Sequence, residues 1–449
     1  MNEGNVIDGL QTRTRPSAST QLGERVRQLR VAAGLTQTNL AGTRFSKEYI
    51  SQIERGKTRP TQETIEFLAT QLGVDAGYVA NGVETAELSR AEAQLAQAEA
   101  LLAGARYQEA AEAFEGAQAG VAATGLAELE LQRVCGLSWA LMESGDVRRA
   151  VDMLVEVQTW SSFSSMNDLQ RADYLYRLGV GRARLGSTHV AMGILSEAFK
   201  AGTEALASEA LLAGILSWRS MCLQRLRDID LAREDAEHAV ALSERSGDPR
   251  TQAYALFQAS LAADREGRYV LARRYAEQAR AKYEEIDDQV QLGKILNNLG
   301  GVHFQMGDHD TALEHFKRAY SCLLDAGSDA LCGAVLCSIA AVHLERGDFT
   351  TAEEQAQLSI TLLEQDEEWA QECGENYYYL GRALLGQQKL DAAQEALERS
   401  VQLLEAVRAT NALARTILAQ GDLARARDDE QGAGDLFRRA AELLQDVNF

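Results

Sequence analysis

The feature that most constrains the fold is an alanine that recurs every 40 or 41 residues over most of the chain. Five of these alanines follow a glycine by five residues, and a small residue always stands twelve positions earlier. Repetition at such a period predicts stacked copies of one supersecondary unit, which bury a continuous core together. The nine alanines are Ala110, Ala150, Ala191, Ala232, Ala272, Ala312, Ala352, Ala393 and Ala433, and the small residues are Ala98, Ser138, Gly179, Ser220, Ser260, Gly300, Ala340, Gly381 and Gly421.

Composition indicates that the repeating unit is helical. The 449 residues include only three prolines, and aromatic residues make up 6% of the chain. A chain rich in Ala, Leu, Glu, Gln and Arg, without strand-like alternation, predicts an all-α fold. Small residues at fixed places on two helices let the helices approach closely, so each unit is interpreted as a helical hairpin, giving about nine hairpins over residues 91–449.

The charge divides the chain into two parts. Residues 1–80 contain 10 basic and 8 acidic residues, and the remaining 369 contain 35 and 58, so the net charges are +2 and −23. A weakly basic segment attached to an acidic body favours a small polyanion-binding head. With the repeat and helix signals, this divides the chain into a flexible arm (1–19), a polyanion-binding head (20–80), a linker (81–90) and the repeats.

The head shows start and stop signals for five short helices. Thr36, Ser46 and Thr61 are predicted N-caps of the second, third and fourth helices, and Gly56 and Gly73 are predicted to end the last two of these. The second helix is expected over residues 37–41 and the third from residue 46 to about residue 55. Five helices in about 60 residues is the size of a small DNA-binding domain.

The stretches "LGERVRQLRVAAGLTQTNLA" and "YISQIERGKTRPTQETIEFLATQLGV" resemble the Xre family of Cro and phage-repressor helix-turn-helix domains. One departure is the segment "GTRF" between Ala41 and Ser46, which has four residues where the family has five and predicts a tighter turn. On the third helix Lys47, Glu48 and Gln52 share the face opposite the apolar residues, so we predict that they read base edges.

The resemblance further implies that phosphates are held by Gln37, Ser46, Lys57 and Arg59. The alternative is that all these side chains are solvated residues of a small helical domain. In the arm, Arg13 and Arg15 could reach a minor groove, although an unstructured tail is the simpler interpretation.

The repeats resemble the tetratricopeptide family, most clearly in "LNNLGGVHFQMGDHDTALEHFKRAY" (residues 296–320). The period exceeds the usual 34 residues and the signature proline is missing, so each helix is expected to be longer by most of a turn. The register favours this family over HEAT repeats. The resemblance implies a right-handed superhelical solenoid with the first helix of each hairpin on the concave side.

By the same resemblance, the concave groove is lined by inward side chains that could bind an effector. Arg184, Arg225 and Arg265 occupy one position in three consecutive hairpins and could pair with carboxylates, or could merely complement helix C-termini. We expect the effector site between the third and sixth hairpins. The groove residues are Tyr176, Arg184, Gln224, Arg225, Tyr254, Phe257, Arg265, Lys294, Asn297, Tyr378 and Arg382.

Other classes of function lack support in the sequence. No apolar run is long enough for a membrane span, and the six cysteines are interpreted as reduced packing residues in a cytoplasmic protein. There is no P-loop, HExxH or nucleophile-elbow motif, so we expect no enzyme activity, no cofactor and no metal.

The combination of head and repeats resembles bacterial peptide-sensing, quorum-sensing transcription regulators. It implies a homodimer on a two-fold double-stranded DNA operator in the nucleoid, with a peptide or protein ligand in the groove. The alternative is a DNA-anchored scaffold that recruits another protein and responds to no small effector.

Overall fold

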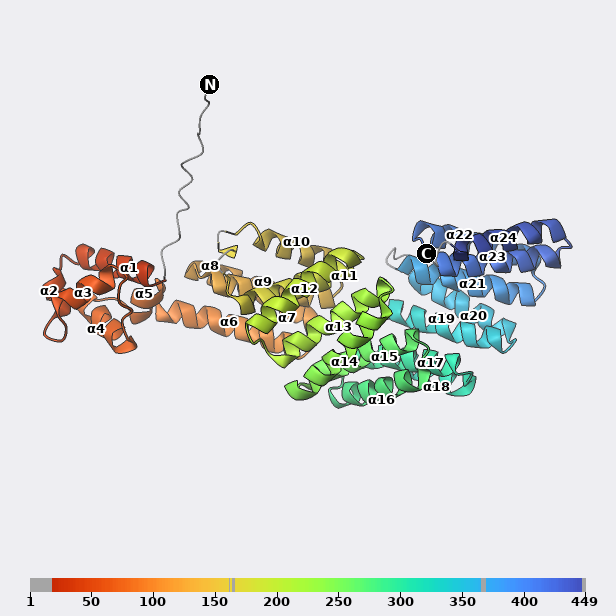
Figure 1. Ribbon diagram of the computed structural model, residues 1–449, viewed down its shortest axis with the longest axis horizontal. Helices are drawn as coiled ribbons and strands as arrows, with labels where there is room; N and C mark the ends of the chain where they lie inside the picture. Colours follow the sequence, from red (N-terminus) through yellow and green to blue (C-terminus); the bar gives the residue numbers. More distant parts are fainter. Residues whose placement is uncertain (1–17, 161, 164–165, 365–368, 446–449) are drawn as a thin grey trace, which may run out of the picture. The chain divides into compact units, whose positions relative to one another are not determined.

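The computed structural model describes residues 18–160, 162–163, 166–364 and 369–445, and divides into two compact units, residues 1–166 and 167–449. Of the arm predicted for residues 1–19, residues 1–17 lie outside the described residues. The first helix begins at Ala18. Each unit is described separately below, with the helix labels of Figure 1.

The first unit begins with the five predicted helices of the head: α1 (Ala18–Ala32), α2 (Gln37–Ala41), α3 (Lys47–Glu54), α4 (Gln62–Leu72) and α5 (Ala76–Asn81). The predicted caps are confirmed, because the side chains of Thr36, Ser46 and Thr61 each accept a backbone N–H of the helix they precede. The buried core includes Val26, Leu40, Ile50, Ile53, Leu68 and Val79.

The first two hairpins complete this unit: α6 (Thr85–Ala103) with α7 (Tyr107–Gly116) and α8 (Gln118–Thr124), then α9 (Ala127–Glu143) with α10 (Val147–Val157). The linker predicted for residues 81–90 is shorter than expected, because α6 already begins at Thr85. The Asp75 carboxylate caps α5 and also accepts hydrogen bonds from Thr85, at 2.8 Å from its backbone N and 2.7 Å from its Oγ1. The head is therefore tied directly to the first repeat helix.

The second unit contains seven hairpins, which follow one another in chain order (Figure 1). Most of its helices have 17 residues, as the long period predicted. The hairpins are α11 (Asp168–Arg184) with α12 (Thr188–Glu204), α13 (Glu209–Arg225) with α14 (Ile229–Ser246), α15 (Pro249–Arg265) with α16 (Tyr269–Glu285), α17 (Gln289–Gln305) with α18 (His309–Asp325), α19 (Asp329–Glu345) with α20 (Phe349–Leu363), α21 (Ala370–Gly386) with α22 (Leu390–Ala406), and α23 (Thr410–Ala426) with α24 (Glu430–Gln445).

The division between the units falls inside the repeats, after the second hairpin. There α10 has 11 residues, and ten residues, 158–167, separate it from α11.

The recurring alanines lie at the hairpin contacts, which explains the sequence pattern. All nine are at most 1% exposed. The small residue twelve positions earlier faces the residue four positions after the alanine: a Cβ added to Gly300 would lie 2.4 Å from Phe316, and one added to Gly381 would lie 2.6 Å from Leu397. Where the small residue is Ser220, its hydroxyl donates to the carbonyl of Ala232 at 2.7 Å.

The turn inside each hairpin contains a residue in the left-handed conformation five positions before the alanine. In five hairpins this residue is glycine, as the sequence pattern showed. In the other four it is Ala105, Arg227, Gln388 or Asp428, with φ between 58° and 63°. L-residues adopt this conformation at a cost of about 1–2 kcal/mol.

Successive first helices of the second unit approach each other more closely than successive second helices do. Direct contacts join α13 to α15 and α19 to α21, whereas no comparable contacts join the second helices among the described residues. The first helices therefore line the inner side of the curved array, as predicted. This inner side is called the concave surface below.

Candidate functional site

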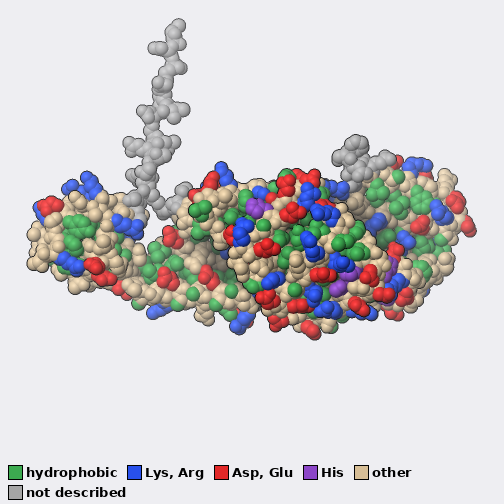
Figure 2. Space-filling view, turned by 60° about the horizontal axis from the view of Figure 1, so that its bottom comes forward, with side chains coloured by type: hydrophobic (Ala, Val, Ile, Leu, Met, Phe, Trp, Pro, Cys, Tyr) green, Lys and Arg blue, Asp and Glu red, His purple; other side chains and the backbone are tan. Residues whose placement is uncertain are grey.

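The third helix of the head presents a polar face that is open to solvent. Its residues Ile50, Ile53 and Glu54 are buried in the head, whereas the predicted base readers Lys47, Glu48 and Gln52 are exposed. Ser46 caps this helix through a 3.1 Å hydrogen bond from the backbone N–H of Tyr49. The capped N-terminus and the exposed side chains lie together, as docking in a major groove requires. The visible face of the head in Figure 2 also shows several groups of Lys and Arg side chains.

A buried ion pair fixes this helix on the head. Glu54 accepts from Arg30 at 2.5 Å (Nε to Oε1) and 3.1 Å (Nη2 to Oε2), and from Gln37 Nε2 at 2.7 Å. Burial raises the pKa of the Glu54 carboxyl, but hydrogen bonds from Arg30 and Gln37 and the charge of Arg30 outweigh it, so the pKa is lowered. The carboxylate therefore stays charged and joins α1, α2 and α3.

The four predicted phosphate contacts lie at different places on the head. Lys57 and Arg59 are exposed in the loop between α3 and α4. The side chains of Ser46 and Gln37 already have protein partners, since Ser46 caps α3 and Gln37 donates to Glu54. The side chains of Gln37 and Ser46 are therefore already paired. Only their backbone, at the starts of α2 and α3, remains for a phosphate contact.

Sequence reasoning missed Arg44, in the tight turn between α2 and α3. Its guanidinium lies 5.8 Å from the ring centroids of both Phe45 and Phe67, and 3.2 Å from the Glu63 carboxylate. Half of its side chain remains exposed. The signal available in the sequence was a basic residue within the shortened turn before the recognition helix.

On the concave surface, aromatic and basic side chains from three hairpins form a row. The Arg184 guanidinium stands 5.4 Å from the ring centroid of Trp218, which stands 5.9 Å from that of Tyr254. Tyr176 packs over the backbone of Gly214, where an added Cβ would lie 2.8 Å from its hydroxyl. Trp218 was not among the predicted groove residues.

The other two arginines of the predicted ladder are engaged with helix ends. Arg225 donates to the carbonyl of Ala183 at 2.9 Å, and Arg265 donates to the carbonyl of Gln224 at 3.2 Å. Each carbonyl belongs to the last turn of the preceding first helix. Burial, followed by the charge of Arg225, lowers the pKa of Arg265. Both side chains thus perform the helix-complementing role that the sequence left open.

On the first helices of the fifth and sixth hairpins, α15 and α17, three buried oxygen atoms lack a hydrogen-bond partner within the described part of the chain. They are Gln258 Oε1, Asp264 Oδ1 and Asn297 Oδ1. Burial also raises the pKa of the Asp264 carboxyl. Unpaired buried polar atoms are costly, so a polar ligand could satisfy them.

The remaining predicted groove residues differ in their exposure and in their partners. Phe257 and Lys294 are half-buried in the middle hairpins, and Arg382 donates to the Tyr378 hydroxyl at 3.4 Å in the eighth. The prediction that Gln224 lines the groove is wrong, because Gln224 is only 3% exposed and its amide donates to Ser220 at 3.3 Å. It is packed between helices and does not line an accessible surface.

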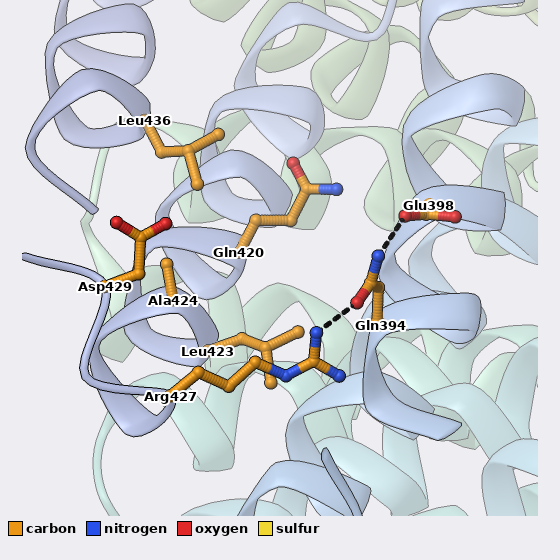
Figure 3. Close-up of a pocket in the computed structure, with 8 residues that line it drawn as sticks. All are labelled: Gln394, Glu398, Gln420, Leu423, Ala424, Arg427, Asp429 and Leu436. Atoms are coloured by element: carbon orange, nitrogen blue, oxygen red, sulfur yellow. Dashed lines mark hydrogen bonds between the residues drawn. The ribbon is translucent and has the colours of Figure 1, made fainter. Parts of the chain in front are cut away.

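A cavity of about 260 Å³ at the end of the array, between α22, α23 and α24, is shown in Figure 3. Its polar groups already pair with each other: Arg427 donates to Gln394, which donates to Glu398 at 2.7 Å, and Arg427 also pairs with Asp391 at 2.6 Å. This cavity therefore offers a ligand few unsatisfied partners.

Within the described residues, no group of three or more His, Cys, Asp or Glu side chains could hold a metal ion. No described helix is both long and apolar enough to cross a membrane. Basic and acidic side chains are interspersed over the visible face of the repeats (Figure 2).

Comparison with known proteins supports both parts of the architecture. A helix-turn-helix domain model matches residues 21–81, and a tetratricopeptide repeat model matches residues 291–365. The chain therefore combines a helix-turn-helix domain with tetratricopeptide repeats. The head is similar to the HTH-type transcriptional regulator DdrOP3 of Deinococcus deserti, with 40% identity over 65 residues, which are 14% of this chain and 50% of that protein. The chain thus spans about half the length of this curated relative.

Two solved structures are similar to most of the chain. A Rap protein complexed with competence and sporulation factor has a TM-score of 0.60 and 14% identity, covering 80% of this chain and 99% of that one. The apo form of the quorum sensor NprR from B. thuringiensis has a TM-score of 0.59 and 14% identity, covering 79% and 99%. At this identity the likeness shows a shared fold.

Proposed function

We propose that the chain is a transcription regulator that binds a specific DNA operator as a homodimer. The observation that carries the proposal is the exposed row of Lys47, Glu48 and Gln52 on a capped helix held by a buried ion pair. Lysine and glutamine suit guanine and adenine edges, and glutamate accepts from the cytosine amino group. A single head covers half a site, and a two-fold dimer gives the second half.

The test compares two kinds of substitution on an operator selected from random duplexes and on a scrambled duplex. Combined Lys47→Ala and Gln52→Ala substitution should weaken operator binding by roughly 1–3 kcal/mol per lost base contact while leaving scrambled binding nearly unchanged. The matched control, Lys57→Ala, should weaken both and reduce the salt dependence. Equal losses on both duplexes from the double variant would remove the two residues as base readers.

The concave surface is proposed to bind an effector, such as a peptide, in the middle hairpins. The support is the coincidence there of the half-buried Arg184 and Tyr254, which flank the buried Trp218, with the unpaired oxygen of the half-buried Asn297. An asparagine side chain can accept and donate at once, as a peptide backbone requires. The effector would change the affinity for the operator. The size of this change is limited by the difference between the effector's affinities for the two arrangements of the heads.

Asn297→Ala gives a selective test of this site. Because its Oδ1 is buried without a partner, the substitution should not lower the stability of the array. DNA titrations with fractions of culture medium should show an affinity change for the original chain and a smaller one for the variant, with equal affinity in the absence of effector. A chain whose DNA affinity is unchanged by every fraction would instead favour the scaffold that recruits another protein.

A further inference from the structure

The turn inside the fourth hairpin lies close to the eighth and ninth hairpins, far away in the sequence. A cavity of about 310 Å³ separates them, so the second unit curls back toward itself at this point. The fourth hairpin contributes Arg227, α21 contributes Gln371 and Glu375, and the α22–α23 region contributes Arg408 to Ala412 and Arg415. The space is large enough for a small ion or for the end of a longer molecule.

The charge around this cavity is unbalanced. Three guanidinium groups line it, against the single carboxylate of Glu375, which stands 3.6 Å from Arg415. Among the described residues, no carboxylate lies within ion-pair distance of Arg227 or Arg408. Arg227 and Arg408 are exposed, so solvent screens their repulsion, but three guanidinium groups around one cavity make a positive spot that attracts an anion.

Two of the three arginines also share a backbone conformation. Arg227 and Arg408 both adopt left-handed conformations, with φ of 63° and 56°. The turn position of Arg227 is glycine in five other hairpins, such as Gly307, and the turn position of Arg408 is glycine at Gly247 and Gly327, while other non-glycine residues with positive φ occupy further turns. An arginine there has a conformational cost that glycine avoids.

The first turn of α23 lines the same cavity. Its N-cap, Ala409, has no side chain that could accept a hydrogen bond from the helix start. The N–H groups of this turn add partial positive charge beside the arginines.

We propose that this cavity binds an oxyanion, a carboxylate or a phosphate, which bridges Arg227 to Arg408 and Arg415. Guanidinium groups recognise both anions through paired N–H donors. The bound anion would hold the fourth hairpin against the last two and so fix the curvature of the second unit. This site does not depend on the function proposed above, because neither DNA nor the middle of the concave surface takes part in it.

Calorimetry on the full chain tests the proposal with two probes at constant ionic strength. One is inorganic phosphate, and the other is a short peptide with a free C-terminal carboxylate, compared with its amidated form. We expect one of these probes to bind and to raise the unfolding temperature. Binding of phosphate alone identifies a phosphate site, and binding of the free peptide but not of the amide identifies a carboxylate site.

The test variant combines Arg227→Asn and Arg408→Asn, because asparagine tolerates the left-handed conformation. The affinity of this variant for the probe should be at least about tenfold weaker. A tenfold loss corresponds to the loss of a single favourable contact. Two controls should bind as the original chain does: Gln388→Asn, at a left-handed turn outside the cavity, and Arg438→Asn, an exposed arginine on α24. The proposal would be overturned if neither probe binds at millimolar concentration. It would also be overturned if the double variant binds the probe as tightly as the original chain does.

Discussion

Replacing Glu54 by glutamine should loosen the head more than any exposed charge substitution. The Glu54 and Arg30 side chains are 4% and 13% exposed, so the change leaves a buried guanidinium beside a neutral amide. Breaking a buried ion pair costs about 3–5 kcal/mol, and glutamine keeps one acceptor, so we expect about 3 kcal/mol. A domain of this size is stabilised by only about 3–9 kcal/mol.

Hydrogen exchange of the α3 and α4 amides in the full chain measures this loss, because it reports the local opening free energy of the head within a multidomain protein. Glu63→Gln is the matched control, since Glu63 and its partner Arg44 are 80% and 52% exposed. Such exposed pairs contribute about 0–1 kcal/mol. Equal opening free energies for the two variants would show that the buried pair does not hold α3 in place.

Acid provides a second measurement of the same interaction. The pKa of Glu54 lies below its ordinary value of 4.5, so the ion pair stabilises the head above that pH and is lost as the pH falls through the lowered pKa. The Glu54→Gln variant lacks this contribution, so exchange at α3 should depend less steeply on pH below about 4.5 than in the original chain. Parallel pH profiles for the two proteins would refute the argument.

Three other predictions concern the repeats. Gln388→Gly should raise the stability of the array by about 1 kcal/mol or less in urea titrations, because glycine relieves the left-handed turn but loses more entropy on folding. Gly300→Ala should cost about 1–3 kcal/mol, and Phe316→Leu in the same chain should recover part of it, since the added Cβ would meet that ring. Burial, then the charges of His303 and nearby arginines, lowers the pKa of His315 to about 4, from 6.5. Its neutral form stabilises the fold above pH 6.5, and that stability should be lost between pH 6.5 and 4, which NMR titration and a less acid-sensitive His315→Gln variant would check.

The repeat period and the caps could be predicted from sequence because each depends on local rules. A residue such as Ala312 is constrained by its own hairpin, in which any larger side chain would separate the helices. The pairing of Gly300 with Phe316, and of Gly381 with Leu397, follows from the same contact, since a bulky residue on one helix requires a missing Cβ on the other. Similarly, Ser46 caps α3 whatever the rest of the chain does.

Features that depend on the accumulated curvature of the array could not be predicted this way. Each hairpin is rotated slightly relative to the last, and no single repeat encodes the sum of these rotations. No local sequence pattern therefore indicates that Arg227, Arg408 and Arg415 line the same cavity. Trp218 was missed for a related reason, because its row with Arg184 and Tyr254 forms only when three hairpins stack.

Two arginines of the fourth hairpin show how recurrence separates structural from functional side chains. Arg225 and its counterpart Arg265 in the next hairpin perform the same task, donating to a carbonyl at the end of the preceding first helix. Arg227 stands two residues later, where five other hairpins have glycine, and it lines a cavity that no other turn of its kind reaches among the described residues. A recurring residue answers a need of the repeat itself. Arg227 instead lines a cavity with two other arginines, which is why we look for a ligand of the second unit at Arg227 and not at Arg225.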